Sequence, residues 1–129
     1  MKPITKRLLP GQDLKAEIER LVSEHHITAG TLTSVVGSLS KLTLRIADGK
    51  TVMTWDKEFE IVSGTGTLSI DGCHLHISAS DNEGKTIGGH LKSGCIINTT
   101  AEIVLISFEG VQYRRLPDEK TGYDELSVE

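Results

Sequence analysis

The chain has 129 residues, 37% of them hydrophobic and 25% charged, with a net charge of −4 at pH 7. This composition is typical of one soluble globular domain and argues against a disordered chain, while the acidic charge makes DNA a poor electrostatic partner. No apolar run approaches the roughly 18 residues of a membrane helix, and two cysteines, Cys73 and Cys95, are too few for a disulfide framework, so we expect a cytoplasmic protein with no membrane partner.

The first predicted element is a helix. Asp13 follows Pro10-Gly11 and is a suitable N-cap, because its carboxylate can accept a hydrogen bond from a free backbone N–H. From Leu14 to Val22, apolar residues recur at helical spacing, with charged residues on the opposite face. The segment Thr28–Gly30 is expected to end this helix.

After Gly30 the sequence predicts strands and turns. Turns are expected at Asp48-Gly49 and Asp71-Gly72, with a turn-rich loop over Asp81–Lys85. The strongest strand signal covers Ile103–Phe108. The pattern predicts an α+β fold in which one main helix packs on a largely antiparallel, twisted sheet of about six to eight strands.

Residues 1–129 are expected to form a single domain, because no linker, internal repeat or low-complexity tract interrupts them. A turn at Glu109-Gly110 leads into a strand over Val111–Arg115. From about residue 116 to residue 129, we expect an acidic C-terminal tail with a frayed end.

The most informative pattern lies in residues 73–91. Side chains alternate between the two faces of a strand, so the apolar residues of this segment point into the core while His74 and His76 point the other way. With 81–85 as the loop of a hairpin, His76 faces His90 directly and His74 is diagonal to it. A register shift of two residues would place His74 opposite His90 instead. In either register the three imidazoles converge.

Three histidines in this arrangement can bind a divalent transition metal. Zinc binds imidazole nitrogens at about 2.0–2.1 Å, and three protein ligands with one open position are typical of a catalytic zinc site. The predicted metal ligands are His74, His76 and His90, and Gly88 and Gly89 leave room beside His90 for a ligand or another chain. The alternative is a solvated strand face on which the histidines bind nothing.

Other candidate residues carry weaker signals. Glu60, Asp81 and Glu102 are candidate carboxylate neighbours of the metal, although such residues are more often ordinary surface charges. Cys73 shares the apolar strand face, which favours a buried structural thiol. The run Tyr113–Arg115 pairs an aromatic residue with arginines, as nucleic-acid contacts do, but adjacent strand residues face opposite ways and do not form one patch.

Several segments together resemble the PPC domain, the plant- and prokaryote-conserved domain. The resemblance runs nearly from end to end, and its most specific parts are HLHIS at 74–78 and IGGHL at 87–91, in this order. The chain is identified as a stand-alone microbial member of the family without an AT-hook. The remaining matching segments are PGQDL at 10–14, ITAG at 27–30, VGSLSKLTLR at 36–45, FEIVSGTGTL at 59–68, TAEIVL at 100–105 and TGYDEL at 121–126.

This resemblance implies a compact α+β domain that assembles into a homotrimer. Microbial members of the family carry a metal, often zinc, on histidines at the positions of His74, His76 and His90, so zinc is the first candidate cofactor. Plant members bind DNA in the nucleus through an AT-hook, which centres on an Arg-Gly-Arg-Pro core. This chain has no such segment.

Three functions remain open at this stage. The first is a trimeric PPC-family module with a candidate role in DNA binding or regulation and a three-histidine metal site. The second is a metal-dependent enzyme, or a protein that binds a small ligand at the open position of that site. The third is a trimeric scaffold or partner-binding protein with a structural metal. The residues do not decide between an enzyme and a binding protein.

Overall fold

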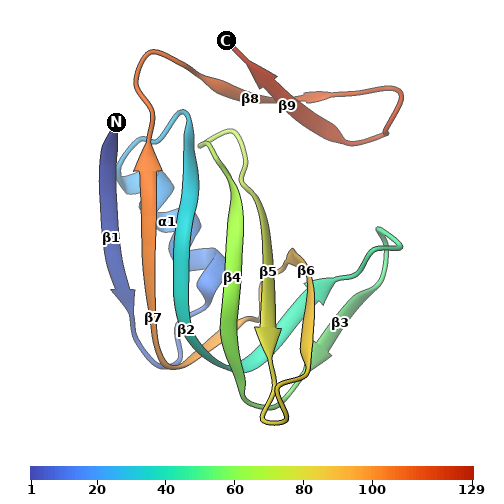
Figure 1. Cartoon of the computed structure of the whole chain (residues 1–129). Coiled ribbons are helices and arrows are strands. Elements are labelled where there is room, and N and C mark those ends of the chain that lie inside the picture. The colour runs from blue at the N-terminus through green and yellow to red at the C-terminus, as the bar shows by residue number, and fades with distance from the viewer.

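A long second strand organises the fold. The computed structural model describes all 129 residues, with one helix and nine strands (Figure 1). The elements are β1 (Lys2–Leu8), α1 (Leu14–Glu24), β2 (Gly30–Arg45), β3 (Val52–Trp55), β4 (Phe59–Leu68), β5 (His74–Ser80), β6 (Thr86–Leu91), β7 (Ile96–Ser107), β8 (Tyr113–Pro117) and β9 (Asp124–Val128).

Seven strands form one antiparallel sheet in the order β1-β7-β2-β4-β5-β6, with β3 paired to β2. The first part of β2 lies between β7 and β4, and its last part pairs with β3 and β6. Register shifts near Leu32, Gly37 and Leu39 mark irregularities in the β2–β7 pair, and bulges of this kind bend a strand. The pairing of β6 with the end of β2 closes β2, β4, β5 and β6 into a ring. The predicted α+β fold, with one helix and a largely antiparallel sheet, is confirmed.

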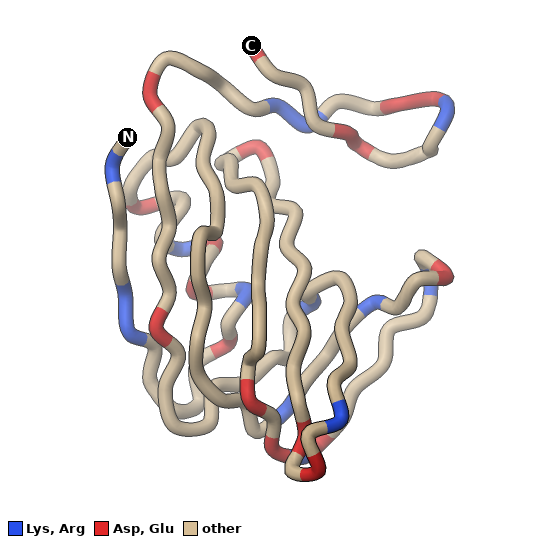
Figure 2. The backbone as a smooth tube through the Cα atoms, in the orientation of Figure 1, with Lys and Arg blue, Asp and Glu red and all other residues tan.

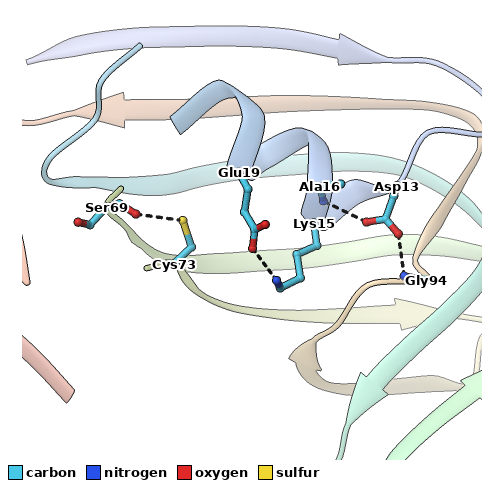
Figure 3. A network of polar contacts seen from close by, with 7 residues as sticks. All are labelled: Asp13, Lys15, Ala16, Glu19, Ser69, Cys73 and Gly94. Carbon is cyan, nitrogen blue, oxygen red and sulfur yellow. Dashed lines mark hydrogen bonds and ion pairs between the residues drawn. The ribbon is translucent and has the colours of Figure 1, made fainter. Parts of the chain in front are cut away.

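The helix α1 begins where the sequence predicts. One carboxylate oxygen of Asp13 accepts a hydrogen bond from the backbone N–H of Ala16 at 3.0 Å, and the other accepts one from the N–H of Gly94 at 2.7 Å (Figure 3). Asp13 therefore caps the helix and also ties it to the loop before β7. Leu14 and Ile18 on the inner face of α1 are fully buried, and the helix lies behind β1, β7 and β2 in Figure 1.

The core is one cluster of 24 buried apolar residues. In β5, Leu75, Ile77 and Ala79 are buried, whereas His74 and His76 are exposed, so the predicted alternation of faces is confirmed. Cys95 is buried and Cys73 is half-buried, and both thiols are free. None of the helical structure is long and apolar enough to cross a membrane.

Two segments differ from the expectations set by the sequence. Residues 2–8, for which no element was expected, form β1 and pair along their whole length with β7. Residues 116–129 do not fray, because most of them join the hairpin of β8 and β9 that lies across the top of the sheet in Figure 1. Tyr113 anchors this hairpin: its N–H donates to the carbonyl of Thr28 at 2.9 Å, and its carbonyl accepts from the hydroxyl of Ser69 at 3.0 Å. These anchors are distant in sequence, which is why the local pattern did not reveal them.

Candidate functional site

The three predicted histidines meet on the outward face of β5 and β6. His76 lies opposite His90 in the antiparallel pair, as the first of the two registers predicted. The ring centroid of His74 is 4.9 Å from that of His76 and 5.2 Å from that of His90, and the third separation is 5.5 Å. One ring nitrogen of each histidine lies within 4.8 Å of the others. The alternative register, with His74 opposite His90, is wrong.

The spacing of the nitrogens fits a transition metal. Nε2 of His74 and Nε2 of His76 are 3.1 Å apart. Two ligands that each lie about 2.0–2.1 Å from a tetrahedral zinc ion are about 3.3–3.4 Å apart, so this pair already has nearly that spacing. The nitrogen of His90 lies within 4.8 Å, and a change in its side-chain torsion can bring it closer. No carboxylate or thiol belongs to the cluster, so it offers three ligands.

Two glycines set how closely the strands around the histidines approach. A Cβ atom at Gly66 would lie 2.2 Å from the carbonyl oxygen of His74, so β4 runs this close to β5 only without a side chain there. A Cβ atom at Gly89 would lie 2.7 Å from the carbonyl oxygen of Arg45 on β2. The room that Gly89 leaves beside His90 is therefore taken by β2 of the same chain, and not by a ligand or a second chain as the sequence suggested.

Burial and neighbouring charges keep two of the imidazoles neutral. Burial lowers the pKa of His90 to about 4, and the guanidinium of Arg45 adds to this effect. Burial also lowers the pKa of His74, with smaller contributions from His76 and Arg115. A metal binds the lone pair of a neutral imidazole. At neutral pH, His90 and His74 therefore need not lose a proton before they bind a metal.

Arg45 lies beside the cluster because β2 pairs with β6 at this point, with Arg45 opposite His90. Nη2 of Arg45 is 3.4 Å from Nδ1 of His90. Because a guanidinium only donates hydrogen bonds, Nδ1 of His90 is the acceptor. Cζ of Arg45 is also 5.9 Å from the ring centre of Tyr123, at the tip of the β8–β9 hairpin. Arg45 thus connects the histidines with the hairpin.

A cavity of about 460 Å³ opens between the histidines and the hairpin. The sheet and the turn between β4 and β5 form one wall, and the hairpin forms the other. The two basic side chains, Arg45 and Arg115, come from opposite walls. The residues that bear on its chemistry are Arg45, His74 and His90 from the sheet and Arg115, Tyr123 and Glu125 from the hairpin.

The carboxylates that the sequence suggested as metal neighbours lie elsewhere. Asp81 lies in the β5–β6 loop and forms an ion pair with Lys57 at 3.1 Å. Glu60 lies opposite Ser80, at the far end of β5 from His74. Glu102 is on β7, and none of the three lines the cavity. The three carboxylates are therefore not neighbours of the histidines, in agreement with the favoured interpretation of them as ordinary charged residues.

Three residues around the cavity were missed by the sequence interpretation: Arg45, Tyr123 and Glu125. Arg45 reaches the site only because β6 returns to β2, and Tyr123 and Glu125 belong to a segment expected to be a tail. Arg115 was considered only as a nucleic-acid contact at the end of a predicted strand. The TGYDEL segment contributes only to the family resemblance, and nothing in its local pattern indicates a cavity wall.

Two weaker candidates lie in or near the cavity. Cys73 lines the cavity and is half-buried, whereas the sequence predicted a buried thiol; it donates to the carbonyl of Ser69 at 3.7 Å, and burial raises its pKa (Figure 3). Nε of Arg114 is 3.5 Å from the carboxylate of Asp71, whereas Arg115 lines the cavity. The two arginines therefore do not form one basic patch.

Comparison with known proteins identifies the family. The model of the Plants and Prokaryotes Conserved (PCC) domain matches residues 1–109. The chain belongs to this family. The match includes all three histidines and Arg45, and it ends before the β8–β9 hairpin.

This chain is similar to a segment of a longer protein. Over 123 residues, which are 95% of the chain, it is 49% identical to "Bifunctional protein GlmU" from Synechococcus sp. (strain JA-3-3Ab). The chain spans about a fifth of the length of the curated relatives that it matches.

Several solved structures have a fold similar to that of this chain. A hypothetical protein from Salmonella cholerae-suis has a TM-score of 0.96 and 34% identity, over 99% of this chain and 93% of the other. A protein from Archaeoglobus fulgidus, described as metal-containing, has a TM-score of 0.80 and 26% identity over 98% and 94%. A Bacteroides thetaiotaomicron protein named as a candidate DNA-binding protein has a TM-score of 0.88 over 97% and 91%, and at 22% identity it shares the fold.

Proposed function

We propose that this protein binds a transition-metal ion, with zinc as the first candidate, through His74, His76 and His90, and presents the open coordination position of that ion to a small molecule. The observation that carries the proposal is the convergence of three imidazole nitrogens within 4.8 Å of one another at the edge of a cavity of about 460 Å³.

Three further observations support a metal on these residues. The 3.1 Å spacing of two Nε2 atoms is close to that of two zinc ligands. The lowered pKa values of His74 and His90 leave these rings neutral and ready to bind at neutral pH. The Archaeoglobus protein described as metal-containing has the same fold and 26% identity with this chain.

A zinc ion with three histidine ligands supplies a Lewis acid and lowers the pKa of a bound water molecule towards about 7. The side chains of this protein would then decide what enters. Arg45 and Arg115 offer hydrogen-bond donors to the cavity, and Glu125 on the hairpin is a candidate proton acceptor. A hydrolase or lyase activity that is lost both with a chelator and in His90→Ala would make the protein a metal-dependent enzyme. Activity that survives both would exclude this mechanism.

Metal content by mass spectrometry on untagged protein tests the proposal directly. We expect one transition-metal ion per chain, lost in His76→Ala and retained in Ser78→Ala. Ser78 is a matched control because it is the next outward-facing residue of β5 and does not belong to the histidine cluster. Metal should also raise the melting temperature of the wild type and of Ser78→Ala, but not that of His76→Ala. Metal-free wild type after reconstitution with zinc, or full retention of metal in His76→Ala, would contradict the proposal.

The competing candidate is a DNA-binding or regulatory module, which the family resemblance and the name of the Bacteroides protein suggest. Charge argues against it, because affinity for DNA depends on lysines and arginines that neutralise phosphates, and the net charge of this chain is −4. Figure 2 shows basic and acidic segments interspersed along the backbone. A fluorescence anisotropy titration with random duplex DNA at low salt decides the matter. Binding at micromolar protein would favour the DNA-binding candidate, and its absence would favour the metal-dependent one.

We also propose that the chain assembles into a homotrimer in the cytoplasm. Val36 and Val62 are 53% and 58% exposed, and the β2–β4 register makes them cross-strand neighbours on one face. An exposed apolar pair of this kind suits a contact between copies. Mass photometry should report trimers for the wild type and smaller species for Val62→Glu, and a monomeric wild type would contradict the assembly. The free thiols of Cys73 and Cys95 suit a reducing compartment.

A further inference from the structure

We propose that the cavity beside the three histidines binds a small organic carboxylate, and that Arg45 and Arg115 pair with its carboxylate group. This inference rests on the proposed metal site and names the chemical class of its ligand. Neither guanidinium group forms an ion pair, although the carboxylates of Asp71, Asp124 and Glu125 line the same cavity.

The ion pairs of the chain leave both guanidinium groups out. These pairs are Lys15–Glu19, Arg20–Glu17, Lys57–Asp81 and Arg114–Asp71. Nη2 of Arg115 donates to the hydroxyl of Thr67 at 2.7 Å, and Nη2 of Arg45 makes only the long contact with His90. A guanidinium has five N–H donors in a rigid fork that matches the two oxygens of a carboxylate. Most of these donors remain available to a ligand.

The acidic residues of the cavity are engaged elsewhere or stay apart from the arginines. Asp71 accepts a hydrogen bond from the backbone N–H of Arg115 and pairs with Arg114. Glu125 accepts one from the hydroxyl of Thr121 at 3.3 Å, and Asp124 has no ion-pair partner. Their negative charge disfavours a doubly charged guest. With the proposed divalent ion and two arginines against three carboxylates, the cavity has a formal charge of about +1, which a singly charged carboxylate balances and a dianionic phosphate exceeds. The volume, about 460 Å³, falls within the range of small-molecule pockets, about 300–1,000 Å³.

Metal binding would release Arg45 for this role. In the structure, Nδ1 of His90 offers its lone pair to Nη2 of Arg45. If the metal takes Nδ1, that lone pair is used. If the metal takes Nε2, the neutral ring carries its proton on Nδ1 and can no longer accept a hydrogen bond from a guanidinium. Either way the contact between Arg45 and His90 is lost, and the guanidinium is free to turn towards an anion. Metal and carboxylate should consequently bind with positive coupling.

Calorimetry and visible absorption of Co²⁺-loaded protein test the inference without any assay of turnover. The probes are acetate, lactate and pyruvate, with acetamide and lactamide as neutral controls and inorganic phosphate as the competing oxyanion. We expect at least one of the three carboxylates to bind and to change the Co²⁺ absorption bands, with no response to the amides and weaker binding of phosphate. Metal-free protein should bind the same carboxylate at least about tenfold more weakly.

Variants then identify the arginines. Arg115→Gln and Arg45→Gln should each weaken carboxylate binding by about tenfold or more, because each removes a charge-assisted contact. Arg7→Gln is the matched control, since Arg7 also donates to a threonine hydroxyl, Thr100, but lies on β1 outside the cavity. Arg45→Lys keeps the charge but not the forked guanidinium, so its affinity for the carboxylate should lie between those of the wild type and Arg45→Gln. This variant also controls for a folding defect in Arg45→Gln.

The outcomes separate the two proposals. Co²⁺ that fails to bind the wild type overturns the metal site itself. Co²⁺ bound at one ion per chain, with no response to any carboxylate, overturns the ligand class and leaves the metal site intact. Phosphate that binds more tightly than the carboxylates, or arginine variants that bind a carboxylate as the wild type does, would equally overturn the inference.

Discussion

Protons compete with a metal for histidine nitrogens, and the surroundings of His90 predict an unusually weak competition at this site. An imidazole with the ordinary pKa of about 6.5 loses about 25-fold in apparent metal affinity between pH 7 and pH 5, so three such ligands lose about 15,000-fold together. His90, with a pKa of about 4, loses only about 10% over the same range. The behaviour of His90 alone therefore makes the expected loss about 20-fold smaller than the value for three ordinary imidazoles, and the lowered pKa of His74 reduces it further.

Calorimetric titration of metal-free protein with Co²⁺ at pH 7, 6 and 5, in a weakly coordinating buffer, measures this loss. Arg45→Gln supplies the comparison, because the Arg45 guanidinium is the second cause of the lowered pKa of His90, after burial. Its removal should raise that pKa and make the affinity fall more steeply with acid. Arg7→Gln removes a guanidinium outside the cavity and should follow the wild type.

A wild-type loss near the roughly 15,000-fold expected for three ordinary imidazoles would refute the reasoning. It would mean that all three rings take up protons near their usual pKa. If the wild type and Arg45→Gln lose affinity equally, Arg45 has no part in the effect, and burial alone accounts for it.

Three further predictions concern stability. Metal-free protein should keep its full stability above about pH 6.5 and lose part of it as the pH falls towards about 4, because the unfolded chain protonates His90 before the folded chain does. Urea unfolding at several pH values measures the free energy of unfolding, and a value that does not change with pH would contradict the prediction. Gly89→Ala should cost about 1–3 kcal/mol and lower the melting temperature, since its Cβ would lie 2.7 Å from the carbonyl oxygen of Arg45. Asp13→Ala should cost about 1–3 kcal/mol in denaturant unfolding, because it removes the cap of α1 and the bond to Gly94. Wild-type stability in either variant would count against the corresponding contact.

The parts of the molecule that the sequence predicts well depend on neighbours in sequence. The cap at Asp13 involves a residue three positions away, and the β5–β6 hairpin is closed by a five-residue loop. The period of two places all three histidines on one face, and the loop at 81–85 sets the register in which His76 meets His90. A site carried by one hairpin can therefore be predicted from the sequence.

The second wall of the cavity could not be predicted in this way. Arg45 stands opposite His90 because a 16-residue strand bends and closes on β6, and bends of this kind leave little trace in a hydrophobic pattern. The hairpin of β8 and β9 is rich in charged residues and offers no buried face of its own. Contacts with Thr28 and Ser69, far away in sequence, fix its place. For residues 116–129, the acidic composition alone therefore suggested a tail.

The hairpin also divides the roles within the candidate site. The family match, residues 1–109, contains the three histidines and Arg45 but neither β8 nor β9. The three histidines thus belong to the part of the chain that the family model matches, whereas Arg115 and the rest of the second wall lie outside that match. If this division holds, replacing both Arg115 and Tyr123 on the hairpin with Ala should leave the metal content unchanged and lower the affinity for carboxylates. Loss of metal in this double variant would show instead that the hairpin holds the histidines in place, and the two roles would then be one.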